Sequence, residues 1–116
     1  MGKTRRTFRI EFMPDTKQHL NSLTARDRAT VLDAIERRLQ HDPTVATRNR
    51  KRMRPGWTSA WELRIGSLRV YYDVQDAPSA LVTVRAIGVK DRNKVRIGGE
   101  EVKHAVLQDV EDPGTD

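Results

Sequence analysis

Cysteine is absent from this chain of 116 residues. Its absence excludes disulfide bonds, thiolate metal sites and a cysteine nucleophile. Aromatic residues make up only 5% of the chain and hydrophobic residues 36%. No apolar run reaches the length that spans a membrane, and the first residues lack the continuous apolar segment of a secretory signal. We therefore expect a cytoplasmic protein with no membrane partner.

The sequence also lacks the usual patterns of cofactor and metal sites. No glycine-rich phosphate loop precedes a helix, and no cluster of carboxylates suggests a metal nuclease. His19, His41 and His104 are scattered without the spacing of metal ligands, so we expect each to be a surface histidine. The sequence predicts no metal and no cofactor, and it leaves Arg, Lys, Glu and Tyr for any catalysis.

Positive charge is what the chain has in excess. Lysine and arginine total 22 against 16 acidic residues, and the formal net charge is +6. The planar guanidinium of arginine matches the geometry of a phosphate, so an arginine-rich surface suggests an anionic partner. Nucleic acid and an acidic protein both fit, and a surface that serves only solubility is the alternative.

The length predicts one domain over residues 1–116, with one modest core. Apolar and charged residues alternate over 7–13, which is the period of a half-buried strand. A short helix through Leu20 and Leu23 should follow. A longer helix should then run from an N-cap at Thr24 to about Gln40. Its expected apolar stripe is Leu32, Ile35 and Leu39.

Residues 44–59 show little periodicity and predict a basic loop. Five of the seven residues in the segment RNRKRMR, 48–54, are basic. At the other end of the chain, residues 100–110 could form a short helix, and the acidic tail 111–116 should be frayed.

The stretch 61–74 predicts a β-hairpin. Apolar and polar residues alternate on both sides of Gly66-Ser67, a two-residue signal for a type II′ turn that fixes the register. In that register Arg64 lies opposite Arg69. The same polar face carries Glu62, Tyr71 and Asp73.

A further strand is expected over 80–89. The fold class is therefore α+β with two layers. A strand and two helices precede a three-stranded antiparallel meander, the first strand lies beside the last, and the helices cover one face of the small sheet.

Two arginines opposed on a sheet repel each other, so the pair needs an explanation. Either Glu62 and Asp73 neutralise it, or a phosphate bridges both guanidinium groups. Tyr71, on the same face, could stack on a base. Other basic residues would either follow a phosphate backbone or form ordinary solvated surface. They are Arg48, Arg50, Lys51, Arg52 and Arg54 in the loop, and Lys90, Arg92, Lys94 and Arg96 after the last strand.

The segment WELRIGSLRVYYDV, 61–74, resembles the core of the RelE/ParE toxin superfamily. The resemblance extends from FRIEF at 8–12 through the two helices to IGVKDRNKV at 87–95. It implies the toxin of a bacterial type II toxin–antitoxin pair, with a cognate antitoxin as partner. Members of the RelE branch cleave mRNA in the ribosomal A site, by attack of a ribose 2′-OH on the adjacent phosphate without a metal.

The resemblance assigns roles by position. Arg69 would stabilise the transition state, and Arg64 would contact RNA. Lys90 stands where the RelE branch has a second catalytic arginine, and Arg92 lies close enough to compensate. Glu62 could act as the base, as carboxylates do in some relatives.

The sequence also departs from the branch. Its catalytic tyrosine aligns with Arg96, and its strand lysines align with Ala60 and Glu62. A ParE-like inhibitor of DNA gyrase, or a non-catalytic relative that only binds its antitoxin, therefore remains as an alternative to the ribosome-dependent endoribonuclease.

Overall fold

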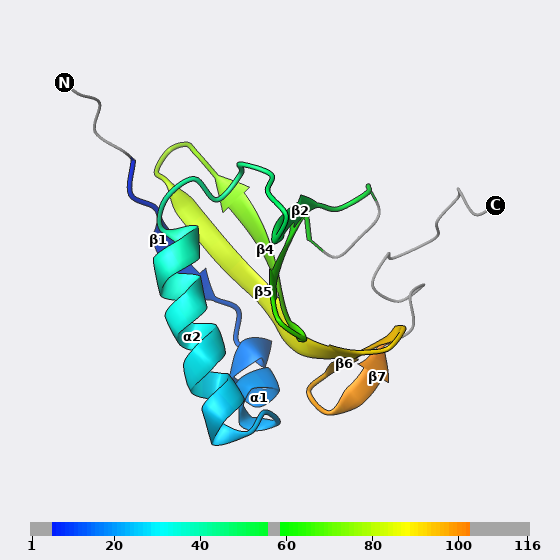
Figure 1. Cartoon of the computed structure of the whole chain (residues 1–116). Helices are drawn as coiled ribbons and strands as arrows, with labels where there is room; N and C mark the ends of the chain where they lie inside the picture. The colour runs from blue at the N-terminus through cyan, green and yellow to red at the C-terminus, as the bar shows by residue number, and fades with distance from the viewer. Residues whose placement is uncertain (1–5, 56–58, 103–116) are drawn as a thin grey trace.

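The computed structural model describes residues 6–55 and 59–102, and their fold is α+β, as predicted (Figure 1). Two helices accompany an open sheet. Along the chain the elements are β1 (Arg9–Phe12), α1 (Asp15–Asn21), α2 (Ala25–Leu39), β2 (Arg50–Arg52), β3 (Trp61–Ile65), β4 (Leu68–Gln75), β5 (Leu81–Asp91), β6 (Lys94–Ile97) and β7 (Glu100–Val102).

The β3–β4 hairpin has the register that its two-residue turn predicts. Ile65 pairs with Leu68 and Arg64 with Arg69. Gly66 has φ +60, while Ser67 is not in the left-handed region, as a type II′ turn requires. The turn therefore sends every second side chain of both strands to the same face of the sheet.

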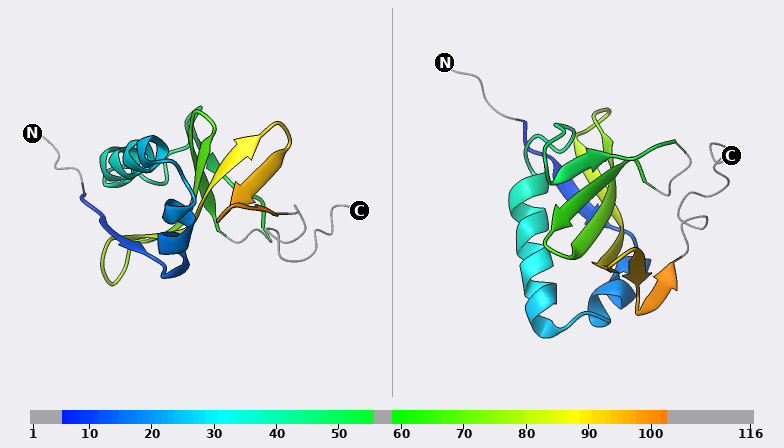
Figure 2. Two further views of the ribbon diagram at one scale, coloured as in Figure 1. Left: turned by 90° about the horizontal axis from the view of Figure 1, so that it is seen from below. Right: turned by 45° about the vertical axis from the view of Figure 1, so that its right-hand side comes forward.

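Strand β5 joins the parts of the sheet. The strand order is β2-β3-β4-β5-β6-β7, and β1 pairs with β5 in parallel, beside the last strand of the predicted meander. Strand β4 occupies one edge of β5. The other edge pairs with β1 over 81–84 and with β6 over 88–91. Helix α2 packs against the sheet at β4 and α1 against β5, and the β6–β7 hairpin lies away from α2 (Figure 2).

Helix α2 begins as predicted, because the Thr24 side chain accepts a hydrogen bond from the Asp27 N–H at 3.0 Å. Its buried face carries Val31, Ala34, Ile35 and Leu39. The prediction that Leu32 lies in the apolar stripe is wrong, since its side chain is exposed at the margin of that face. Neither helix within the described part of the chain is long and apolar enough to cross a membrane.

Three predictions about the loops and the end of the chain need correction. The segment 44–59 contains strand β2, which pairs with β3 although its three residues are all basic and carry no alternation. The segment 90–96 does not follow the last strand, because β5 runs to Asp91 and β6 begins at Lys94. Residues 100–102 form a strand and no helix. Residues 103–116, with the tail, lie outside the described residues.

His19 is not the surface residue that the sequence predicts. It is half-buried on α1, and its Nδ1 accepts a hydrogen bond from the Ile87 N–H at 3.3 Å. Ile87 lies on β5 between the residues paired with β1 and those paired with β6. The imidazole thus lies where, among the described residues, β5 pairs with neither β1 nor β6. Burial lowers the pKa of His19 below its ordinary value of 6.5.

The lowered pKa predicts a loss of stability in acid. The unfolded chain binds a proton at His19 more readily than the folded chain does. The contribution of His19 is therefore fully present above about pH 6.5 and decreases as the pH falls toward the pKa of the folded state. His19→Asn keeps an acceptor for the Ile87 N–H but does not titrate. We expect chemical unfolding at about pH 7.5 and about pH 5 to show a smaller loss of stability in His19→Asn than in the wild type. Equal losses would contradict this role.

Candidate functional site

The face of the sheet opposite the helices carries the polar residues of the hairpin. Cross-strand partners point to the same face, so Lys51, Glu62, Tyr71 and Ala86 form one row across four strands. Arg64, Arg69 and Gly88 form the next row, and Lys90 and Val95 lie beyond it. This register gathers side chains from five strands on one surface.

A pocket of about 290 Å³ is hollowed into this surface. Five basic residues and one acidic residue line it, which makes it positively charged, although the register turns the Arg52 side chain toward Trp61 on the other face. Its lining residues are Lys51, Arg52, Met53, Arg54, Glu62, Arg64, Tyr71, Lys90, Asn93 and Val95. Sequence reasoning named the charged residues and Tyr71. It missed Met53, Asn93 and Val95 as lining residues, because nothing in the sequence shows that β2 pairs with the hairpin or that β6 folds back beside β5.

Glu62 lies between the two arginines of the hairpin. Its carboxylate is 2.8 Å from Nε of Arg64 and 3.9 Å from Nε of Arg69. The Glu62 side chain is only 8% exposed, so little water screens these contacts. Of the two explanations for the opposed arginines, neutralisation by Glu62 fits the geometry. Asp73 takes no part, since it contacts Arg85 at 3.3 Å and accepts from the Ala60 N–H at 2.6 Å.

Arg69 is buried and does not line the pocket. Its Nη1 donates to the carbonyl oxygens of Gly66 at 2.8 Å and Leu68 at 3.0 Å. The guanidinium thus returns to the β3–β4 turn that precedes it. Its geometry is that of a residue that holds the turn and orients Glu62. Arg64, with a side chain 35% exposed, is the hairpin arginine that reaches the pocket.

Tyr71 offers the site its phenol group and not a ring surface on which a base could stack. The residue is 1% exposed, so its ring is not open to a base. Burial raises the pKa of Tyr71 above its ordinary value, and the charge of Glu62 and a hydrogen bond with it raise it further. The phenol therefore keeps its proton at neutral pH and can act as a hydrogen-bond donor.

The basic segment 48–54 divides into residues with different surroundings. Lys51 shares the pocket face with Glu62. Arg50 points to the helix side, where its guanidinium donates to the carbonyl oxygens of Arg38 at 3.1 Å and Val45 at 2.9 Å. Arg52 lies with its guanidinium 5.6 Å from the centre of the Trp61 ring. Arg50 therefore ties β2 to the end of α2.

Arg48 belongs to the same basic segment, and its side chain is exposed. It does not line the pocket.

The segment 90–96 is divided in the same way. Lys90 lines the pocket, but Arg92, Lys94 and Arg96 do not. Arg92 lies in the β5–β6 turn with φ +62, and Lys94 is 4.0 Å from Glu101. Arg96, which aligns with the tyrosine of the RelE branch, is exposed. Among the residues that the structure describes, no three His, Asp or Glu side chains gather as metal ligands would.

The contacts of Glu62 predict a measurable loss of stability on its removal. Glu62→Gln would leave Arg64 opposite Arg69 without the carboxylate between them. A charged hydrogen-bonded group of this kind contributes roughly 2 kcal/mol, and we expect Glu62→Gln to lower the free energy of unfolding by about that amount in a denaturant titration.

Asp33→Asn is the matched control, because Asp33 pairs with Arg37 on the exposed side of α2 at 3.1 Å. An exposed pair contributes about 0.5 kcal/mol or less. If both variants lose the same small amount, Glu62 does not hold the two arginines together.

Comparison with known proteins places the fold. No family model and no curated protein sequence matches the chain. Among solved structures, the chain is similar to one in the toxin–antitoxin complex RelBE2 from Mycobacterium tuberculosis, with a TM-score of 0.62 and 20% sequence identity. The match covers 77% of this chain and 98% of that chain. The RelE-type fold that the hairpin motif predicted is therefore confirmed.

Proposed function

We propose that this chain is the toxin of a type II toxin–antitoxin pair and cleaves mRNA on the ribosome. The observation that carries the proposal is the pocket on the polar face, where Lys51, Arg54, Arg64 and Lys90 lie around a buried carboxylate and a phenol. The similar solved chain belongs to a toxin–antitoxin complex, which supports an antitoxin as the protein partner.

The charge of the pocket suits an RNA backbone. Lys51 and Lys90 lie on different strands at the two sides of the pocket. A phosphate between them would meet ammonium groups from both sides and the Arg64 guanidinium from the hairpin. Such contacts hold a strand without reading its bases. The exposed Arg48 lies outside this surface and should contribute little.

The cleavage step uses these side chains. The ribose 2′-oxygen attacks the adjacent phosphorus and forms a new O–P bond, while its proton passes to the Glu62 carboxylate. The bond from phosphorus to the 5′-oxygen breaks, and that oxygen takes a proton from the Lys90 ammonium. The products are a 2′,3′-cyclic phosphate and a 5′-hydroxyl. Arg64 donates to the charge that develops on the phosphorane oxygens, and the Tyr71 phenol holds Glu62 in place through their hydrogen bond.

In this step Arg69 is a positioning residue, because its contact is with Glu62 and the turn carbonyls. Lys90→Met and Arg64→Met are therefore sharper tests than changes at Arg69, which is buried. We expect wild-type protein to cut mRNA during in vitro translation, with sites mapped by primer extension. Each variant should lower the cleavage rate by about a hundredfold, as loss of a transition-state donor does.

Arg48→Met is the control for total charge, because Arg48 is basic and exposed but does not line the pocket. It should cleave at nearly the wild-type rate. Translation that proceeds on uncut mRNA at excess protein would rule out the nuclease.

A ParE-like inhibitor of DNA gyrase is the second candidate. It is favoured by the engagement of Glu62 with two arginines and by the position of Arg96 outside the pocket lining. A gyrase supercoiling assay separates the two functions, because only this candidate predicts inhibition without mRNA cleavage. A chain that is inactive in both assays, yet binds the protein encoded beside it, would be a non-catalytic relative.

A further inference from the structure

Strand β1 has an open edge. In the part of the chain that the structure describes, it pairs with β5 alone. The N–H of Arg9 donates to the Ala80 carbonyl at 3.0 Å, and that of Met13 to the Val84 carbonyl at 2.9 Å. Backbone groups alternate in direction along a strand, so Ile10 and Phe12 direct their N–H and C=O groups away from β5. Such an edge can accept another strand.

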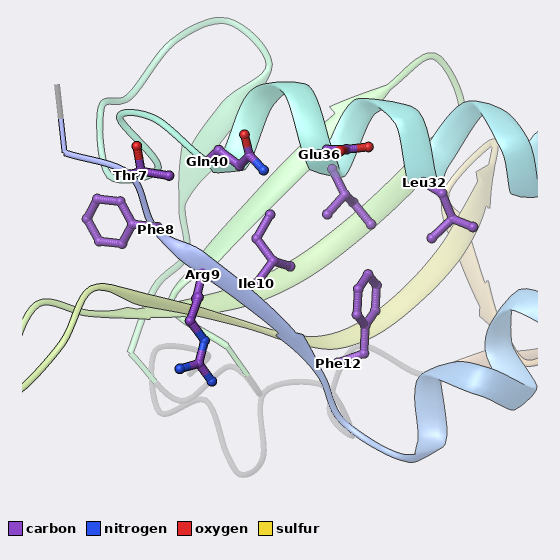
Figure 3. A pocket seen from close by; sticks show the side chains of 9 residues that line it. Thr7, Phe8, Arg9, Ile10, Phe12, Leu32, Glu36 and Gln40 are labelled. Atoms are coloured by element: carbon purple, nitrogen blue, oxygen red, sulfur yellow. The ribbon is translucent and has the colours of Figure 1, made fainter.

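A groove of about 490 Å³ runs beside this edge, between β1 and α2 (Figure 3). Ile10 and Phe12 point toward α2, whereas Arg9 points away from it. Phe12 is 40% exposed and Leu32, facing it from α2, is 36% exposed. Leu32 was expected in the apolar stripe of α2, but it and Phe12 border an apolar depression of about 400 Å³ that continues to Met13. These exposed apolar side chains lie beside the strand edge, where a paired strand would cover them.

The sequence of β1 is complementary to itself. Residues 8–12 read Phe-Arg-Ile-Glu-Phe. If two copies pair antiparallel with Ile10 opposite Ile10, Arg9 lies opposite Glu11 on both sides of the centre. Phe8 then lies opposite Phe12. Opposite charges and apolar pairs that face each other across strands stabilise a sheet.

Only this register satisfies both charge and backbone geometry. A shift by two residues places Arg9 opposite Arg9, or Glu11 opposite Glu11, and like charges opposed in this way destabilise the pair. A shift by one residue exchanges the two faces of the strand and moves the apolar side chains away from the groove. In the favoured register, the residues with outward-directed backbone groups also face one another.

We propose that the β1 edge is a self-association surface, on which β1 of a second copy of this chain pairs antiparallel about a two-fold axis at Ile10. The N–H groups of Ile10 and Phe12 donate to the carbonyl oxygens of Ile10 and Phe8 of the other copy. The Phe8 N–H already donates to the Gln40 carbonyl at 2.9 Å, so Phe8 contributes its carbonyl alone. Each copy presents the same surface, as a closed dimer requires.

Charge complementarity favours a second copy of this chain as the partner at the β1 edge. Charged residues on an edge strand ordinarily prevent pairing. Here Arg9 and Glu11 are exposed and already 2.6 Å apart within one chain. A second copy adds a Glu11 opposite each Arg9, so that the charges alternate around the axis. The surface lies at β1 and α2, apart from the basic pocket, and the inference does not depend on the proposed function.

Sedimentation velocity of the purified chain tests the proposal, over about a hundredfold range of concentration. We expect the wild type to shift from monomer toward dimer. Arg9→Glu places like charges opposite each other and should raise the dissociation constant at least about tenfold. Glu11→Arg should do the same. The double variant Arg9→Glu/Glu11→Arg restores complementarity and should recover the dimer, as should a mixture of the two single variants.

Both side chains are exposed, so we expect each variant to fold like the wild type. Circular dichroism of each variant checks that a lost dimer does not reflect unfolding. A wild type that stays monomeric at every concentration overturns the proposal. So does a dimer that Arg9→Glu leaves intact, because it would use another face. A monomer whose β1 amides gain hydrogen-exchange protection only with a co-purified antitoxin would assign the edge to that partner and overturn the proposal as well.

Discussion

The rest of the structure depends on one constraint: two strands, β1 and β6, share the same edge of β5. Strand β4 pairs along one side of β5, while β1 and β6 share the other side in succession. His19 accepts the Ile87 N–H in the interval between them. Within the described residues, this arrangement leaves the outer edge of β1 without a strand partner. It also brings β6 beside the basic residues of the hairpin.

Glu62 decides how the polar face can be used. Two arginines opposed across a hairpin would repel each other, and the buried carboxylate relieves that repulsion through contacts of 2.8 and 3.9 Å. With Arg69 held against the turn carbonyls, the cations that remain available to a ligand lie on neighbouring strands. The candidate site is therefore the pocket to which β2, β3, β4, β5 and β6 contribute, and not the arginine pair alone.

The two surfaces of the chain have different physical characters. The pocket is small, strongly basic and built on the face away from the helices. The groove is larger and bordered by exposed aromatic and aliphatic side chains, between β1 and α2. A polyanion suits the first and a strand with apolar side chains suits the second, so one chain can engage nucleic acid and protein with separate parts of its surface.

The sequence by itself determined the elements that local physics fixes. The Gly66-Ser67 turn and the alternation around it set every pair of the β3–β4 hairpin, and Thr24 set the start of α2. Only the tertiary structure decided that Arg50 binds the end of α2, that Arg69 is buried, and that Phe12 and Leu32 border a groove. A periodic pattern shows which face of an element is apolar. It does not show which element covers that face, because contacts distant in sequence depend on how β1, β2 and β6 pair.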